Sequence, residues 1–155
     1  MRPDHLIELA GSILRIGSGY PRQATINRAI STAYYAVFHA LAGECVARLV
    51  GSPRSSRYWE IVTPIHRSID HGSARRVFER LTREHGTPSA LKQVGTAFLE
   101  LQTARHAADY DPGSRYSRGK ALDFIVQAQS AIETLGAMPK EDRLLLAVQL
   151  ITKPR

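Results

Sequence analysis

The chain has 155 residues, of which 43% are hydrophobic and 23% charged, and this composition excludes a disordered tail and favours one domain over residues 1–155 with a single core. No segment is long and apolar enough for a membrane span, and the amino terminus lacks a signal-like apolar run, so we expect a cytoplasmic protein with no membrane partner. The net charge of +7 is equally compatible with a polyanionic partner and with a surface kept soluble by excess charge.

Turn-forming residues divide the first third of the chain into two helices. Asp4 is a suitable cap for a helix over residues 4–14, and two nearby glycines, at positions 17 and 19, end it. Pro21 then opens a long helix that extends to about Val50, where a Gly-Ser pair closes it. We expect this long helix to be one of two central elements of the fold.

Between residues 54 and 86 the hydrophobic pattern is irregular. Pro64 interrupts the apolar run from Tyr58 to Ile65, and a proline inside a helix removes a backbone hydrogen bond. We therefore expect only a short helix here, after Gly72.

Three further helices are expected in the rest of the chain. Pro88 opens the second central helix, over residues 88–109, whose apolar positions recur at helical spacing. A helix over 117–136 is expected to pack along both central helices, and a short helix over 140–152 is so apolar that it must dock on the bundle or on a partner. The sequence thus predicts an all-α, up-and-down bundle of about five to six helices, with its core over residues 4–136.

One stripe of the long helix is unusually polar. Arg28, Thr32, Tyr35 and His39 recur at steps of three or four residues, so they share one face beside an apolar stripe. A guanidinium group is expensive to bury without a partner. We favour a buried hydrogen-bond network that joins the two central helices, for example from Arg28 or Tyr35 to Asp109, over a direct catalytic role.

A second polar group ends the other central helix. Arg105 and Asp109 are one helical turn apart and are able to pair, while His106 and Tyr110 share the adjacent face. We expect the two polar groups to form a joint site. A metal site is not expected, because the histidines at positions 66, 71 and 85 lack the spacing of helical zinc sites.

These pieces occur in a characteristic order. A long helix carries Arg28, then Ala-Tyr-Tyr-Ala and Phe-His-Ala; much later come Arg105, two residues and Ala-Asp-Tyr-Asp, and then a closing helix with ALDFIVQAQSAI. This order resembles the HEPN superfamily, the higher eukaryotes and prokaryotes nucleotide-binding domains, over most of residues 21–135. The resemblance implies an up-and-down helical bundle that usually dimerises.

Many HEPN members are metal-independent ribonucleases, found as toxins paired with nucleotidyltransferase antitoxins or in defence against phage. The resemblance therefore implies RNA or a nucleotide as ligand, a homodimer, and an antitoxin partner of that kind. The usual catalytic signature of the family is an arginine followed, after four to six residues, by a histidine. Here Tyr110 stands at that distance from Arg105, and His106 directly follows the arginine.

Two hypotheses about function remain open. Metal-free RNA cleavage needs a base for the ribose 2′-hydroxyl, an acid for the leaving oxygen and a cation near the phosphorus centre. In the first hypothesis the protein is a metal-independent endoribonuclease without a cofactor, whose catalytic residues are Arg105, His106 and Tyr110. In the second it is a non-catalytic interaction or nucleotide-binding module, held together by a network of Arg28, Tyr35, His39 and Asp109.

Overall fold

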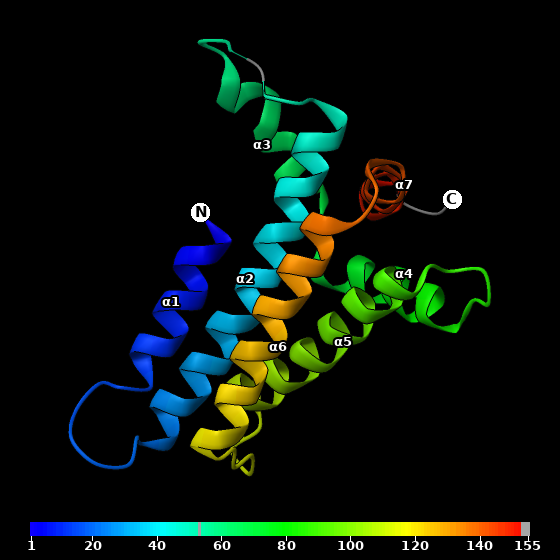
Figure 1. The fold of residues 1–155 in the computed structure, drawn as a ribbon. Coiled ribbons are helices and arrows are strands. Elements are labelled where there is room, and N and C mark those ends of the chain that lie inside the picture. Colours follow the sequence, from blue (N-terminus) through cyan, green and yellow to red (C-terminus); the bar gives the residue numbers. More distant parts are fainter. Residues whose placement is uncertain (53, 153–155) are drawn as a thin grey trace.

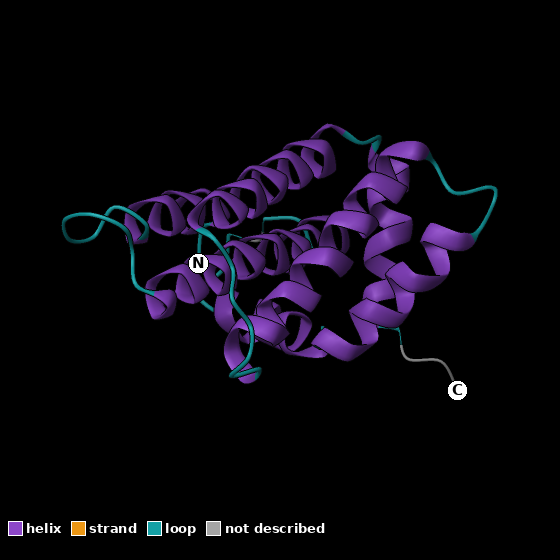
Figure 2. Ribbon diagram, turned by 90° about the horizontal axis from the view of Figure 1, so that it is seen from below, coloured by secondary structure: helices purple, strands orange, loops and turns teal. Residues whose placement is uncertain are grey.

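The computed structural model describes residues 1–52 and 54–152, and over these residues it forms helices and no strand, which confirms the expected all-α bundle (Figures 1 and 2). Within the same residues no helix is both long and apolar enough to cross a membrane. Seven helices are present in this part of the chain, more than expected, because the segment before Gly86 forms two complete helices. In order they are α1 (Pro3–Ile13), α2 (Gln23–Leu49), α3 (Tyr58–Ser68), α4 (His71–Arg83), α5 (Ser89–Tyr110), α6 (Arg118–Ala137) and α7 (Lys140–Ile151).

The long helix α2 forms the centre of the bundle. It packs against α1, α5, α6 and α7, and α3 contacts it as well. Figure 1 shows α1 and α6 running along α2, with α3 beside its carboxyl-terminal end. Ile26, Ser31 and Thr32 are buried although they lie on different sides of the helix. Because α2 is covered on several sides, its polar residues lie at contacts between helices rather than on an open face.

The expectation that Pro64 interrupts the helical pattern between Tyr58 and Ile65 is wrong. Pro64 lies inside α3, where it removes one backbone donor, the N–H that would bond to the carbonyl group of Glu60. The helix continues because Val62 is buried and Ile65 packs against the core, and tertiary packing of an apolar face outweighs the loss of a single hydrogen bond.

The helix α4 packs closely against α5, and this contact brings the residues of the candidate site together. Asp70 caps α4, since its carboxylate accepts a hydrogen bond from the Ser73 backbone nitrogen at 2.7 Å. In α5 the contact is made by Gly95, where a Cβ atom would lie 3.0 Å from ring carbon Cδ1 of Phe78. The absence of a side chain at Gly95 is therefore what allows the two helices to approach.

The last helix, α7, covers the end of α2. On the side of α7 that faces the bundle, Leu146, Ala147 and Leu150 are buried. On its other side, Leu145 and Val148 are 55% and 40% exposed. One side of α7 is thus part of the core, and the other side is an apolar surface.

Candidate functional site

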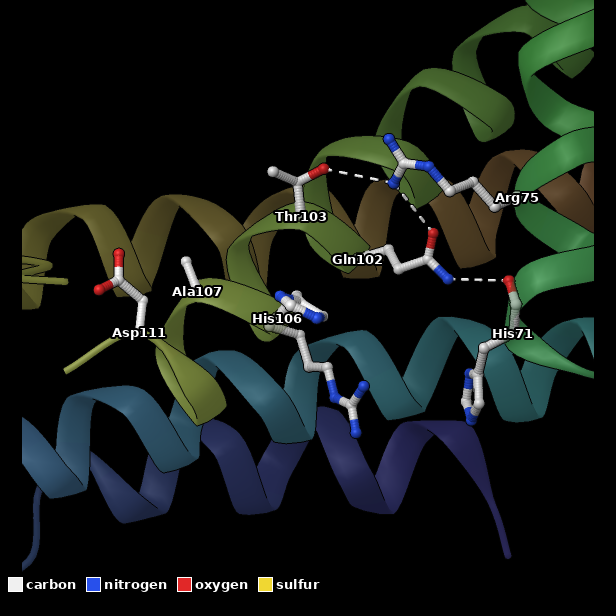
Figure 3. Close-up of a pocket in the computed structure, with 8 residues that line it drawn as sticks. His71, Arg75, Gln102, Thr103, His106, Ala107 and Asp111 are labelled. Carbon is white, nitrogen blue, oxygen red and sulfur yellow. Dashed lines mark hydrogen bonds between the residues drawn. The ribbon is translucent and has the colours of Figure 1, made fainter. Parts of the chain in front are cut away.

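An open cleft with a volume of about 580 Å³ lies between α4 and α5. Figure 3 shows His71 and Arg75, from α4, beside Gln102, Thr103 and His106, from α5. Two guanidinium groups and two imidazoles meet here, an environment suited to an anionic ligand. The complete lining is His71, Arg75, Gln102, Thr103, Arg105, His106, Ala107 and Asp111.

Arg105 is held by three side chains. Its Nε lies 2.9 Å from Oδ2 of Asp109, as an ion pair that lacks the alignment of a hydrogen bond. Its Nη2 donates hydrogen bonds to the hydroxyl groups of Tyr35, at 2.9 Å, and Tyr110, at 3.4 Å. The guanidinium carbon also lies 5.5 Å and 5.4 Å from the centroids of these two rings, within cation–π range. Nη1 makes no hydrogen bond to a described residue, so its donors remain available to a ligand in the cleft.

The predicted link between α2 and Asp109 is made by a residue that the sequence analysis did not choose. Ser31 donates a hydrogen bond to Oδ1 of Asp109 at 2.5 Å, and Tyr35 reaches Asp109 only through Arg105. Arg28 is exposed, and its side chain forms no hydrogen bond or ion pair with the described residues. It lies seven residues before Tyr35, about 10 Å along the helix, so it is not part of the junction.

His106 and Tyr110 lie together at the outer edge of the cleft. Their ring centroids are 5.0 Å apart, and both residues are exposed. The ring nitrogens of His106 form no hydrogen bond with any residue in the described part of the chain. Of the three residues predicted to be catalytic, Arg105 and His106 line the cleft, and Tyr110 contacts both of them.

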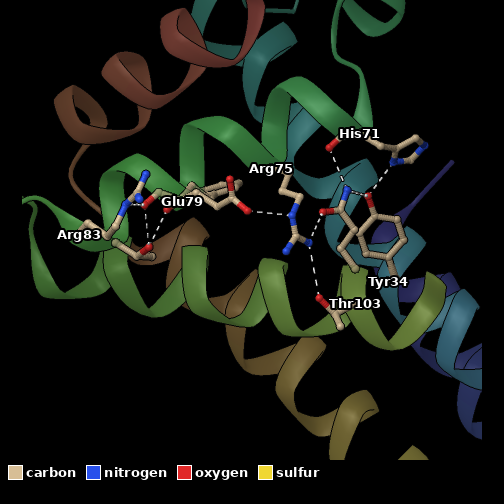
Figure 4. A network of polar contacts seen from close by, with 9 residues as sticks. Tyr34, His71, Arg75, Glu79, Arg83 and Thr103 are labelled. Atoms are coloured by element: carbon tan, nitrogen blue, oxygen red, sulfur yellow. Dashed lines mark hydrogen bonds and ion pairs between the residues drawn. The ribbon is translucent and has the colours of Figure 1, made fainter. Parts of the chain in front are cut away.

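A second network of polar contacts runs along the inner wall of the cleft (Figure 4). The hydroxyl group of Tyr34 and Nδ1 of His71 are 2.6 Å apart. Gln102 donates from Nε2 to the carbonyl oxygen of His71 at 2.8 Å and accepts at Oε1 from Arg75 Nη1 at 3.1 Å. Arg75 is also paired with Glu79, at 2.9 Å. The network fixes His71 and Arg75 relative to α5.

The surroundings of this network determine the protonation states of Tyr34 and His71. Burial raises the pKa of Tyr34 far above its ordinary value, so Tyr34 is a neutral hydroxyl group. Burial, and after it the positive charge of Arg105, lower the pKa of His71, against a smaller opposing effect of Asp70. His71 is therefore a neutral imidazole at pH 7, able to accept a proton.

His39 is not among the residues that line the cleft. It is half-buried, and its Nδ1 is buried without a hydrogen-bond partner in the described part of the chain. Burial lowers the pKa of His39, and the positive charges of the amino terminus and of His66 lower it further. His39 thus takes no part in the contact that Tyr35 makes with Arg105, although both residues share one face of α2.

Four residues of the network on the inner wall were not predicted as part of the site: His71, Arg75 and Gln102, which line the cleft, and Tyr34, which contacts His71. Tyr34 was passed over because it points to the core side of α2, and His71 was weighed only as a metal ligand. Arg75 and Gln102 come from helices whose contact depends on tertiary packing. The only local signal was the position of Gln102, which lies one helical turn before Arg105 and so shares its side of α5.

Arginine and histidine side chains dominate the polar lining of the cleft. Across residues 1–52 and 54–152, no group of three or more His, Cys, Asp or Glu side chains is arranged to hold a metal ion. Comparison with family models, curated proteins and solved structures finds no match.

Proposed function

We propose that this protein is a HEPN-like RNA-acting protein that cleaves RNA without a metal ion, in the cleft between α4 and α5. The observation that carries the proposal is the meeting of Arg75, Arg105, His71 and His106 around one cavity. Guanidinium groups bind phosphate through several donors at once, and imidazoles transfer protons near neutral pH. These are the groups that phosphodiester cleavage by a ribose 2′-hydroxyl requires.

Arg105 is the residue assigned to the reacting phosphate. Its Nε and Nη2 are engaged with the protein, so the group is oriented before a ligand arrives, and Nη1 is left to contact a phosphate oxygen. A cation held in this way stabilises the charge that develops at phosphorus without having to reorganise. Tyr110 acts on the reaction through its contacts with Arg105 and His106, as a positioning residue.

The two imidazoles are assigned to proton transfer. His71 is neutral and fixed by Tyr34, which suits a base that removes the proton of the 2′-hydroxyl. His106, exposed at the edge of the cleft, suits the acid that protonates the leaving 5′-oxygen. The oxygen of the 2′-hydroxyl then forms a bond to phosphorus as the bond to the 5′-oxygen breaks, giving a 2′,3′-cyclic phosphate and a 5′-hydroxyl end.

The resemblance to HEPN proteins extends the proposal to the biological setting. A toxin–antitoxin or phage-defence role, a homodimer and a nucleotidyltransferase antitoxin all follow from that resemblance. The excess of positive charge, +7 for the chain, supports RNA as the ligand, since phosphate contacts dominate the affinity of nucleic-acid-binding proteins.

The test is cleavage of a panel of labelled RNAs, including tRNA, by purified protein in the presence of a chelator. We expect cleavage that leaves cyclic phosphate ends and that is lost in Arg105→Ala and in His106→Ala. Arg15→Ala is the matched control, because it removes the same charge from an exposed arginine in the turn after α1, outside the cleft. Absence of cleavage by a folded wild-type protein would contradict the catalytic assignment.

A second candidate function is a non-catalytic nucleotide-binding or interaction module. It is favoured by the low exposure of Arg105, 17%, and by its contacts with Asp109, Tyr35 and Tyr110, which also serve to join α2 to α5. In that case a mononucleotide binds with little dependence on salt and RNA is not cleaved, whereas an RNA-binding cleft loses affinity steeply as salt rises.

A further inference from the structure

A second groove lies on the other side of α5. It has a volume of about 480 Å³ and lies between α5 and α6. Thr103 lines both this groove and the cleft described above, so the two cavities meet at this side chain. A ligand whose phosphate lies in the first cavity can therefore extend directly into the second. The groove is lined by Leu99, Glu100, Thr103, Ala104, Tyr116, Lys120 and Phe124.

One wall of the groove is apolar and aromatic. The Tyr116 ring stands edge-on to Phe124, with centroids 5.8 Å apart and an interplanar angle of 82°. Tyr116 is half-buried, and Phe124 is almost completely buried behind it. A flat, partly exposed ring held by a buried neighbour is the kind of surface on which a nucleobase stacks.

The polar groups of the groove are a cation and a carboxylate. Lys120 Nζ lies 4.8 Å from the centroid of Phe124 and forms no ion pair with a carboxylate of the described residues, so it is free to contact a phosphate. Glu100 accepts a hydrogen bond from Gln127 at Oε2, which orients the carboxylate. A carboxylate has about four acceptor positions, so Glu100 retains the capacity to accept hydrogen bonds from a ligand.

We propose that this groove is a nucleobase subsite that binds the base next to the reacting phosphate and prefers guanine. The inference rests on the proposed RNA-cleaving function and names the substrate feature that the same site reads. Guanine is the base whose Watson–Crick edge offers adjacent N–H donors, at N1 and N2, to a carboxylate. Glu100 accepts from these donors, Tyr116 stacks on the base, and Lys120 contacts the phosphate that follows.

The test is the affinity of short labelled oligouridines that carry one central guanosine, adenosine or cytidine, measured by fluorescence anisotropy. We expect the guanosine oligonucleotide to bind about tenfold more tightly than the others, the typical discrimination of a bidentate pair. Glu100→Gln should abolish this preference, because it keeps the size of the side chain and replaces one acceptor with a donor.

Three further variants separate stacking from charge. Tyr116→Ala should weaken binding of every oligonucleotide by about tenfold, as expected for loss of a stacking contact, whereas Tyr116→Phe should retain the affinity. Lys120→Ala should lower the magnitude of the slope of the logarithm of affinity against the logarithm of salt concentration by about one, the loss of one phosphate contact. Circular dichroism of each variant verifies that the fold is intact.

The outcomes distinguish the two proposals. If RNA binds in a manner that depends on Arg105 but without any preference for guanine, or if Glu100→Gln retains the preference, the base subsite is refuted and the cleavage proposal stands. If the wild-type protein binds none of the oligonucleotides, both proposals fail.

Discussion

Two clusters of arginine and carboxylate join α2 to its neighbours, and they differ in what surrounds them. Near the middle of α2, Arg105 pairs with Asp109 at 2.9 Å and contacts Tyr35. Near the carboxyl-terminal end, Arg143 of α7 pairs with Glu44 at 3.1 Å. The paired side chains are comparably shielded, with exposures of 17% and 28% in the first cluster and 15% and 19% in the second.

The difference lies in the neighbours of each guanidinium group. Arg105 lines a cleft that also contains His71 and His106, so its pairing holds a cation at the wall of an open cavity. In the second cluster Arg48 lies 3.5 Å from the same Glu44 carboxylate. Its ion pairs join α2 to α7 and, among the described residues, include no imidazole. The same type of ion pair therefore orients the guanidinium group to which we assign the reacting phosphate in one place, and fastens a helix in the other.

Removal of the first guanidinium should have the largest effect. Arg105→Ala is expected to lower the rate of RNA cleavage by about a hundredfold or more, the usual cost of losing a preorganised group that stabilises developing charge. Arg105→Lys should not restore the rate, because lysine cannot contact Tyr35, Tyr110 and a phosphate together. The measurement is single-turnover cleavage of a labelled RNA, and recovery by lysine would mean that only a point charge is needed.

Removal of the second guanidinium should act on stability alone. Arg143→Ala leaves Glu44 with only its longer contact to Arg48, and we expect the free energy of unfolding to fall by about 2 kcal/mol. The rate of RNA cleavage at a temperature well below the melting point should not change. Urea titration followed by circular dichroism gives the first quantity, and a loss of cleavage in the folded variant would show that the two clusters are coupled.

Acidification should destabilise the protein through its half-buried imidazoles. Burial lowers the pKa of His39 and of His71 in the folded state, so below the ordinary histidine pKa of about 6.5 the unfolded chain binds more protons than the folded one. Their contribution to stability is complete above that pH and is lost as the pH falls through the folded pKa values.

This effect can be separated from the titration of carboxylates. Unfolding free energies measured between pH 7.5 and pH 5 should decline less in the double variant His39→Gln, His71→Gln than in the wild-type protein. Equal slopes for the two proteins would contradict the assigned directions of the pKa shifts.

The smallest effect on stability is expected on the outer side of α7. Leu145 and Val148 are 55% and 40% exposed, so replacing both with Asp should change the free energy of unfolding by no more than about 0.5 kcal/mol. If this surface forms the homodimer that the HEPN resemblance implies, the same variant should be monomeric by light scattering. Leu122→Asp, on the exposed side of α6, is the matched control, and an unchanged dimer mass would place the interface elsewhere.

The contacts of the candidate site that lie within one helix could be predicted from the sequence, whereas the contacts between helices could not. Two pairs within α5, Arg105 with Asp109 and His106 with Tyr110, followed from helical spacing, and the structure brings each pair together. The contact of Ser31 with Asp109 did not follow, because a small hydroxyl residue on an apolar face carries no distinctive signal. His71 could not be placed at all, since its approach to Tyr34 depends on how α4 crosses α2 and α5.

The fold shows the same division. Periodic apolar residues and turn signals determined α2, α5, α6 and α7 to within a few residues, whereas the sequence around Pro64 predicted a break that the structure does not contain. A proline destabilises a helix locally, because it removes a backbone hydrogen bond. In α3 this loss is outweighed by the burial of Val62, which depends on tertiary contact with α2.

By itself, the sequence determined the helical class and the polar groups within single helices, because both depend on periodicities along the chain. Only the tertiary structure decided which helices meet, and so placed Arg75 and His71 beside Arg105 and left Arg28 exposed and His39 outside the cleft. The reason is physical: contacts between helices depend on the shapes of packed side chains, such as the missing Cβ of Gly95 against Phe78, and such complementarity has no period in the sequence.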